Sequence, residues 1–370
     1  MADGTTKFEQ YSEWLEDRSD VAAIIMRQWL EPVEGKDAVI FPPTYVKPER
    51  GQDDWLGYNV DTLADGTKIC QIDSVGAQAN RMEPIFMRAE YKHLVPQVVV
   101  TAGDYEVNLL EAGHRAADAI VRFSALAEEL ERAFLDVRKG DATTLAKIAP
   151  TSFVFGAWDS RGTQVKLPRI VRSVIRAFDV QVLHRSAQYV PAIDYVEAGV
   201  IDAPEGKPQQ DAMSELGLRH APAPWTHGGV LAAGGVRRDA ALNLAALRML
   251  AAGPGRDPLP LRRYVLGLAL VAFTAPQDTV LREGCQLIPD PERPAQWALV
   301  RHDGRRDTKF ELTHDAALAF ATAAAREFGV GDDRRVQFDA AAANAASKQS
   351  KDDRKKSRRA RKGGGAEAEA

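Results

Sequence analysis

Cysteine is scarce in this sequence: Cys70 and Cys285 are the only two among 370 residues. Two cysteines cannot build a disulfide framework, and neither has the paired-cysteine spacing of a metal knuckle. We therefore expect both to be reduced and structural, in a cytoplasmic protein.

A long apolar run is also missing. The most apolar window, 261–274, contains Arg262 and Arg263 and is too short to span a bilayer. The first residues are polar and acidic, without the basic start and apolar run of a targeting segment. We expect no membrane partner.

Standard catalytic signatures are absent as well. The segment 156–162 superficially suggests a phosphate loop, but its spacing is wrong and no Gly-Lys-Ser/Thr follows. Ser160 has Trp158 where the glycine of a nucleophile elbow would stand. The seven histidines lie apart, without the spacing of zinc ligands. Missing motifs do not exclude an enzyme, because active sites assemble from distant residues, but they make one less favoured. We predict no catalytic residue, no metal site, no cofactor and a protein that is not an enzyme.

The net charge of −4 hides an uneven distribution. Nine Lys/Arg between 348 and 362 face only two aspartates, so the rest of the chain is acidic overall. A nucleic-acid site in the body must then be a local basic patch on an acidic surface. The basic run itself could bind nucleic acid through charge alone or could be a solubilising tail.

What remains is the composition of a globular protein, with 45% hydrophobic and 27% charged residues. Strands alternate with helices in an irregular order and the loops are long, which favours an α+β fold with insertions. We predict one domain over 1–334 and a disordered basic tail over 335–370.

Hydrophobic periodicity and turn residues predict the elements. Helices are expected at 20–30, 74–84, 114–138, 238–252 and 313–329, strands at 67–73, 97–101, 151–155, 279–288 and 296–302, a helix-to-strand switch near Ala177 within 170–184, a mixed segment at 260–274, and a loop or projection at 197–229.

Three polar segments beside strand ends are candidate binding sites. In the first, a helix beginning near Ser74 would offer its free N–H groups to a phosphate. Gln78, Asn80 and Arg81 would add donors and a positive charge. The alternative is that Ser74 only caps the helix and Arg81 pairs with a nearby carboxylate.

The second segment is the most basic. Five cations fall within sixteen positions, opposed only by Asp159, and could neutralise phosphates. Trp158 could stack on a base, or it could lie in the core beside a solvated basic loop. The cations are Arg161, Lys166, Arg169, Arg172 and Arg176.

The third segment is His114-Arg115, at the expected start of a helix. Positive charge there opposes the helix dipole, which suggests an external ligand, although a surface pair of Arg115 with Asp118 explains it equally. Arg237-Arg238 and His184-Arg185-Ser186 are weaker candidates.

Together these segments resemble the backbone subunit of type I-G (formerly I-U) CRISPR effector complexes, of the RAMP superfamily. The resemblance extends over about 25–330, and its most specific part is the SRGTQ-x-K-x-PR stretch at 160–169. It is carried by DSVGAQANRMEP, HRAAD, PTSFVFGAWDSRGTQVKLPRIVRS and RRDAALNLAALR.

The resemblance implies an RRM/ferredoxin-like palm with insertions that act as fingers and thumb, the thumb being 197–229. It implies CRISPR guide RNA, further copies of this chain along that RNA, target DNA read through the guide, other effector subunits and a recruited helicase-nuclease as partners. Asn80, Arg81, Arg161, Lys166, Arg169 and Arg172 would contact the guide backbone, with Ser74, Gln78, His114, Arg115, Trp158 and Arg176 beside them.

Two alternatives remain open at this point. Relatives in the superfamily process guide precursors, so His114, His184 or His227 could serve an endoribonuclease as general base. A variant is metal-dependent cleavage of target RNA by Asp73 or Asp159. The other alternative is a small-molecule enzyme on an unfamiliar α+β scaffold.

Overall fold

The computed structural model describes residues 2–47, 55, 57–310 and 312–348. The basic run from 349 onward lies outside the described residues, so the predictions made for it are not tested. In the described part of the chain, no helix is both long and apolar enough to cross a membrane.

Four antiparallel strands form the centre of the main sheet: β1 (Val21–Pro32), β8 (Val171–Phe178), β11 (Val236–Asn243) and β14 (Gln296–Arg301). In space they follow the order β14-β1-β11-β8. Counted along the chain, these are the fourth, first, third and second strands. With helices between the first and second and between the third and fourth, this is the ferredoxin-like arrangement, which confirms the expected α+β palm.

Shorter strands widen this sheet on both sides. Next to β8 lie β3 (Lys68–Asp73) and β2 (Val60–Thr62), and beyond β1 lie β13 (Cys285–Pro289), β12 (Val280–Arg282) and β15 (Arg306–Asp307).

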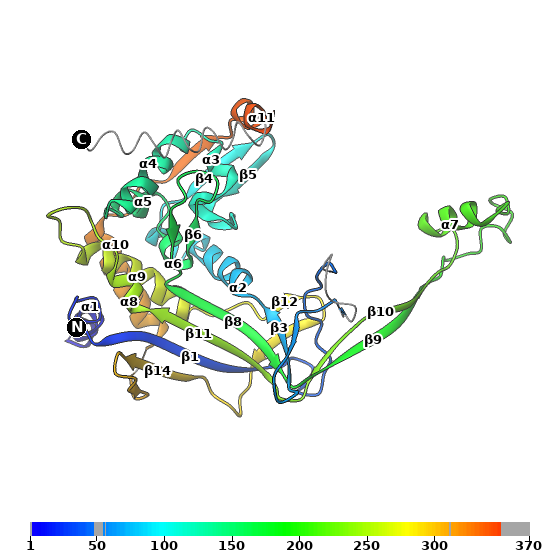
Figure 1. The fold of residues 1–370 in the computed structure, drawn as a ribbon, viewed down its shortest axis with the longest axis horizontal. Helices are drawn as coiled ribbons and strands as arrows, with labels where there is room; N and C mark the ends of the chain where they lie inside the picture. The colour runs from blue at the N-terminus through cyan, green and yellow to red at the C-terminus, as the bar shows by residue number, and fades with distance from the viewer. Residues whose placement is uncertain (1, 48–54, 56, 311, 349–370) are drawn as a thin grey trace.

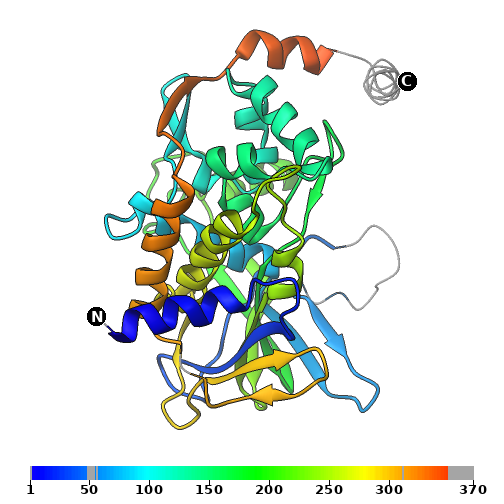
Figure 2. The same ribbon diagram turned by 90° about the vertical axis from the view of Figure 1, so that its left-hand side faces the viewer.

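Helices cover one face of the sheet (Figure 1). They are α2 (Val75–Met82), α6 (Thr151–Phe155), α8 (Leu244–Arg248) and α9 (Leu259–Thr274). Outside them, α10 (His314–Phe328) packs on α9. Helix α1 (Ala2–Glu13) packs on α10 through Phe8, Tyr11 and Phe320 (Figure 2). Because α9 is apolar on nearly all sides, it is buried almost completely.

A second, three-stranded sheet lies above the helices. It joins β16 (Arg334–Gln337), β4 (Val98–Ala102) and β5 (Tyr105–Asn108), and helices α3 (Ala119–Arg122), α4 (Ala127–Arg138), α5 (Thr143–Ile148) and α11 (Ala340–Lys348) lie in the same region (Figure 1). Short 3-10 turns connect these elements at Glu83–Met87, Lys92–Leu94, Leu109–Glu111 and Arg115–Ala117.

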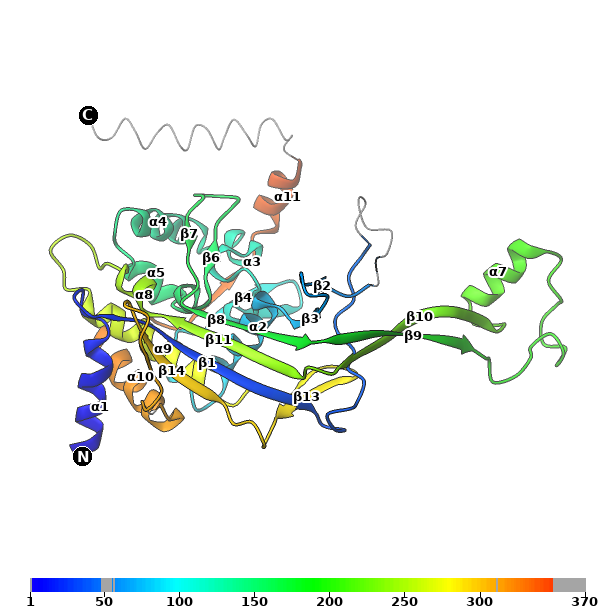
Figure 3. The same ribbon diagram turned by 60° about the horizontal axis from the view of Figure 1, so that its bottom comes forward.

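A long hairpin projects from the main sheet as an arm (Figures 1 and 3). Its strands β9 (Val180–Tyr189) and β10 (Ala221–Ala232) continue from β8 and into β11, and α7 (Lys207–Glu215) lies near its tip. The predicted projection at 197–229 lies within this arm, although much of it is regular strand and helix and not loop.

Several predicted elements are wrong. The expected helix at 20–30 is strand β1, because pairing with β11 and β14 on either side outweighs the helix propensity of its Ala, Met and Leu. Strand pairing also outweighs helix propensity in two other segments that were expected to be at least partly helical: 171–178 is strand β8 and 236–243 is strand β11. The apolar run 151–155 is the buried helix α6, since a short apolar run does not reveal its period.

Two further boundaries need correction. The helix expected over 114–138 is broken, because Phe123 leaves helical geometry between α3 and α4. The tail expected to be disordered from 335 is ordered up to 348: β16 pairs in parallel with β4, and α11 follows. The strands at 67–73, 97–101, 279–288 and 296–302 and the helices at 74–84 and 313–329 are confirmed to within a few residues.

A glycine in α9 sets how closely that helix approaches α10. A Cβ on Gly267 would lie 2.7 Å from the Cα of Ala321, whereas a Cβ on Gly76 in α2 would meet only the Ser74 hydroxyl at 3.8 Å. Helix propensity alone favours alanine at both positions by about 1 kcal/mol. We therefore expect Gly267→Ala to lower the melting temperature and Gly76→Ala to raise it or leave it unchanged. Equal shifts of the same sign in thermal denaturation would contradict this packing.

Candidate nucleic-acid interface

The basic segment forms a small hairpin that one aspartate holds together. Strands β6 (Ala157–Trp158) and β7 (Lys166–Leu167) pair, and the buried Asp159 carboxylate closes the turn between them. It accepts hydrogen bonds from the backbone N–H of Gly162 at 3.0 Å, and from the N–H and hydroxyl of Thr163 at 2.6 and 2.9 Å. Asp159 is thus occupied in positioning the loop that carries Arg161.

Trp158 lies on the outside of this hairpin. Its side chain is 55% exposed, so the alternative that it belongs to the core is wrong. The ammonium of Lys166 lies 5.8 Å from the centre of its ring. An exposed ring beside a cation has the composition of a stacking platform for an unpaired base.

Arginines are crowded together where β7 leads into β8. Partial burial, and then the neighbouring Arg115 and Arg172, lower the pKa of the Arg169 guanidinium. Gly156 makes this approach possible: it has φ +78°, and a Cβ there would lie 2.6 Å from Cγ of Arg169. Like charges held this close favour an anion between them.

Arg172 and Arg176 extend this row along β8. They alternate with Ser173 and Ile175, which face the helices, so both arginines are on the opposite, uncovered face of the sheet. In the described part of the chain, no ion pair or hydrogen bond occupies the side chains of Arg161, Lys166, Arg169, Arg172 and Arg176, which we call the basic strip. This sets the strip apart from many other arginines here, which contact carboxylates.

The first predicted segment is used mostly inside the protein. Ser74 caps α2 by accepting from the N–H of Ala77. Gln78 and Arg81 both donate to the buried carboxylate of Asp73, at 2.7 and 3.1 Å. These contacts match the structural alternative considered above.

Asn80 is the member of that segment that contacts Arg115, whose charge acts on Arg169 of the basic strip. It is exposed at the end of α2, and its carbonyl oxygen accepts from Arg115 at 3.2 Å. The structure thus brings Asn80 and Arg169 together around one arginine, although they are far apart in sequence.

Arg115 itself is buried. Its side chain is 3% exposed, lies 2.6 Å from Glu83 and donates to the carbonyl of Gly156. Its partner is therefore Glu83 and not Asp118, which instead contacts the exposed His114 at 3.4 Å. Burial raises the pKa of Glu83 to about 7, against the lowering effect of the Arg115 guanidinium.

Sequence reasoning missed two aromatic clusters. On the uncovered face of the sheet, the guanidinium of Arg237 lies over Trp29 and Phe178, and Arg293 lies 4.1 Å from the centre of the Trp29 ring. The pairing of Trp29 with Arg237 across β1 and β11 was not visible, because 20–30 had been read as a helix.

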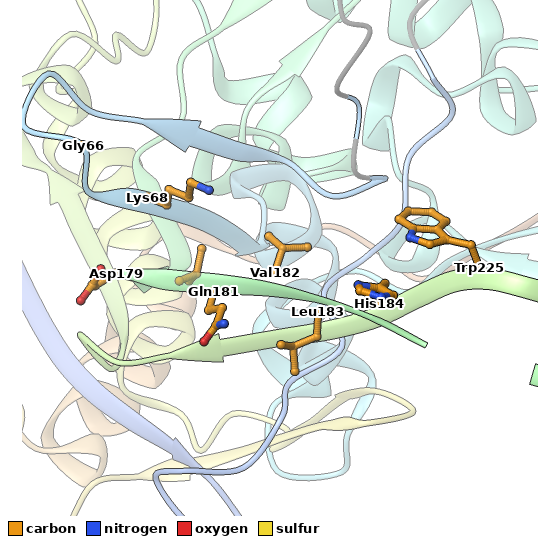
Figure 4. Close-up of a pocket in the computed structure, with 9 residues that line it drawn as sticks. Gly66, Lys68, Asp179, Gln181, Val182, Leu183, His184 and Trp225 are labelled. Atoms are coloured by element: carbon orange, nitrogen blue, oxygen red, sulfur yellow. The ribbon is translucent and has the colours of Figure 1, made fainter. Parts of the chain in front are cut away.

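The other cluster lines a pocket at the root of the arm (Figure 4). Trp225 is exposed and stacks on His184, and His227 lies against its edge. Lys68, Asp179 and Gln181 add polar groups to the lining. Two of the histidines considered as general bases therefore lie in the arm, and His114 lies in the separate 3-10 turn region. The described residues hold no group of three or more metal-ligating side chains.

The buried pair of Arg115 and Glu83 gives a pH-dependent prediction. Removing the cation in Arg115→Met leaves a buried carboxylate without its partner, which lowers the free energy of unfolding by about 3–5 kcal/mol. A Glu83 pKa of about 7 means that the carboxyl is mostly charged near pH 8, where it needs the guanidinium, and protonated near pH 5, where it does not. The loss of stability should therefore be largest near pH 8 and shrink toward pH 5.

Denaturant unfolding at both pH values measures this loss. Arg335→Met is the matched control, because the Arg335–Glu106 pair is exposed and worth less than about 1 kcal/mol. A loss for Arg115→Met that is as small as the control's, or equal at the two pH values, would contradict the assignment.

The chain is similar to one known protein family over part of its length. No curated protein matches it. Residues 24–182 match the model of a family described as CRISPR-associated protein GSU0053. The matched stretch runs from β1 to the start of β9 and contains the whole basic strip. The match covers less than half of the chain, and it shows that this stretch is similar to a CRISPR-associated family.

Proposed function

We propose that the protein is a non-catalytic RNA-binding subunit that forms the helical backbone of a type I-G effector complex along the guide RNA. The observation that carries the proposal is the basic strip: five cations that the chain carries between the β6–β7 hairpin and the end of β8, without acidic partners in the described part of the chain. On a protein of net charge −4, such a local concentration suits a polyanion.

The chemistry of the strip fits a guide and not a sequence-read target. Arg and Lys side chains neutralise phosphates without reading bases, so the base edges stay free to pair with target DNA. Trp158 could support a base by stacking while leaving its pairing edge exposed. Asn80 and His114 are exposed near the strip and would add hydrogen bonds.

The arm supplies the means of assembly in this proposal. It carries exposed apolar side chains, among them Tyr189, Val190, Val200 and Leu216. An apolar projection of this kind favours burial against another molecule. We assign it the role of the thumb, which reaches a neighbouring copy of the chain and the RNA held there; other effector subunits and a recruited helicase-nuclease would complete the assembly.

Arg172→Gln tests the strip. It removes one charge without reversing it, so binding to single-stranded RNA should weaken about tenfold. The slope of log affinity against log salt should fall by about 0.7, the contribution of one phosphate contact. Fluorescence anisotropy with a labelled guide-length RNA, at a series of salt concentrations, measures both.

The control for this variant is Arg138→Gln in α4, where the arginine is exposed, has no ion pair among the described residues and is not a member of the strip. Both variants should melt like the parent protein. Parent-like affinity and slope for Arg172→Gln would remove this arginine from the interface. Discrete cleavage products from a repeat-containing transcript would instead favour the endoribonuclease.

A further inference from the structure

A second cationic site lies on the opposite, helix-covered face of the sheet. Arg238 of β11 is 5% exposed, and its Nε donates to the Ser173 hydroxyl at 2.9 Å. Its Nη2 contacts only the sulfur of Met82, a weak acceptor, at 3.6 Å. In the described part of the chain, no carboxylate lies within ion-pair distance of this guanidinium. Burial lowers its pKa to about 10.

The buried carboxylate that hydrogen bonds connect to Arg238 is already neutralised by other arginines. Ser173 donates to Gln78 at 2.8 Å, and Gln78 donates to Asp73 at 2.7 Å, so a relay connects Arg238 to Asp73. Asp73, however, accepts from both Arg81 and Arg282, at 3.1 and 3.2 Å. Asp73 therefore pairs with two arginines, and Arg238 reaches it only through the relay, so three arginines and one aspartate leave an excess of about two positive charges.

Two of these three arginines, Arg81 and Arg238, line a cavity. The cavity has a volume of about 290 Å³ and lies between β1, β8 and β11 on one side and the segment from Phe273 to Leu281 on the other. Arg81 and Arg238 line it together with Gln28 and Thr279, and Trp297 forms part of the apolar wall. Its acidic lining residue, Asp278, is mostly exposed and is paired with Arg88.

We propose that this cavity binds a small molecule that carries a phosphate monoester. A phosphate monoester has a charge of about −1.5 to −2 at neutral pH, which matches the excess, whereas a single carboxylate does not. The guanidinium groups of Arg81 and Arg238 would bind the phosphate oxygens, and the amide and hydroxyl groups would bind the remainder of the ligand. The apolar wall would hold a flat or aliphatic part.

The proposal is independent of guide binding, because Arg238 and the basic strip lie on opposite faces of the sheet. Inorganic phosphate and 5′-AMP are the probes, each compared with sodium chloride at equal ionic strength on the full-length, RNA-free chain. Either should raise the melting temperature of the parent protein by about 2–4 °C. Sodium acetate, which offers a carboxylate, should have a smaller effect.

Arg238→Met should abolish the shift, and Arg335→Met, which changes an exposed arginine elsewhere, should keep it. Because Arg238→Met removes an uncompensated buried charge, it should fold at least as well as the parent without ligand. An equal shift in parent and Arg238→Met, or no shift with either probe, would overturn the proposal.

A second readout does not depend on that variant. Trp297 lines the cavity, so 5′-AMP should change the tryptophan fluorescence in a saturable way, and Trp297→Phe should lose the change. If the change persists in Trp297→Phe, the ligand binds elsewhere and the proposal fails.

Discussion

The pairing of β11 with its two neighbours, β1 and β8, is the constraint on which the rest of the structure depends. It fixes which side chains face the helices and which face outward. Ser173 and Ile175 face the helices, and side chains alternate along a strand, so Arg172 and Arg176 point to the uncovered face. The same pairing places the side chain of Arg238 on the helix-covered face, where it is buried and lines a cavity.

The arm depends on the same pairing. A single residue, Asp179, separates β8 from β9, and it adopts a left-handed conformation with φ 49°. Opposite it, a Cβ on Gly234 would lie 2.9 Å from the carbonyl oxygen of Phe178. The backbone segments at Gly234 and Phe178 can therefore approach this closely only because position 234 is a glycine. The arm thus leaves the sheet at a bend fixed by backbone contacts, which gives its tip a defined direction.

Charge is distributed unevenly in this protein. Asp73 and Glu83 hold arginines in the interior, and exposed pairs such as Arg335–Glu106 occupy others. Within the described residues, the cations of the basic strip are left without such partners. In a chain that is acidic overall, unpaired cations in a row are the feature that most needs a ligand to explain it.

The sequence predicted those helices whose ends are set by capping residues close to them in sequence. Ser74 and Thr313 cap their helices and Gly329 ends one, so α2 and α10 were predicted closely. The strands β1, β8 and β11 were missed because their neighbours come from distant parts of the chain. Pairing between such segments leaves no local pattern.

The same distinction applies to the candidate site. Clustered cations at 161–176 were visible in the sequence, and they have no ion-pair partner in the part of the chain that the structure describes. A pairing of Arg81 with a nearby carboxylate was one of two alternatives that the sequence left open, and the fold shows that this carboxylate is Asp73. The partner of Arg115 was not visible, because Glu83 is distant in sequence and only the fold brings it near. Trp225 and Trp29 were missed because each becomes part of a cluster through cross-strand contacts.

The most direct measurement is to purify the protein after co-expression with a CRISPR array and to sequence the nucleic acid that it carries. The account predicts an absorbance ratio at 260 and 280 nm typical of a nucleoprotein, and array-derived RNA of uniform length. RNA of random origin, or a protein free of RNA even when its partner subunits are co-expressed, would contradict it.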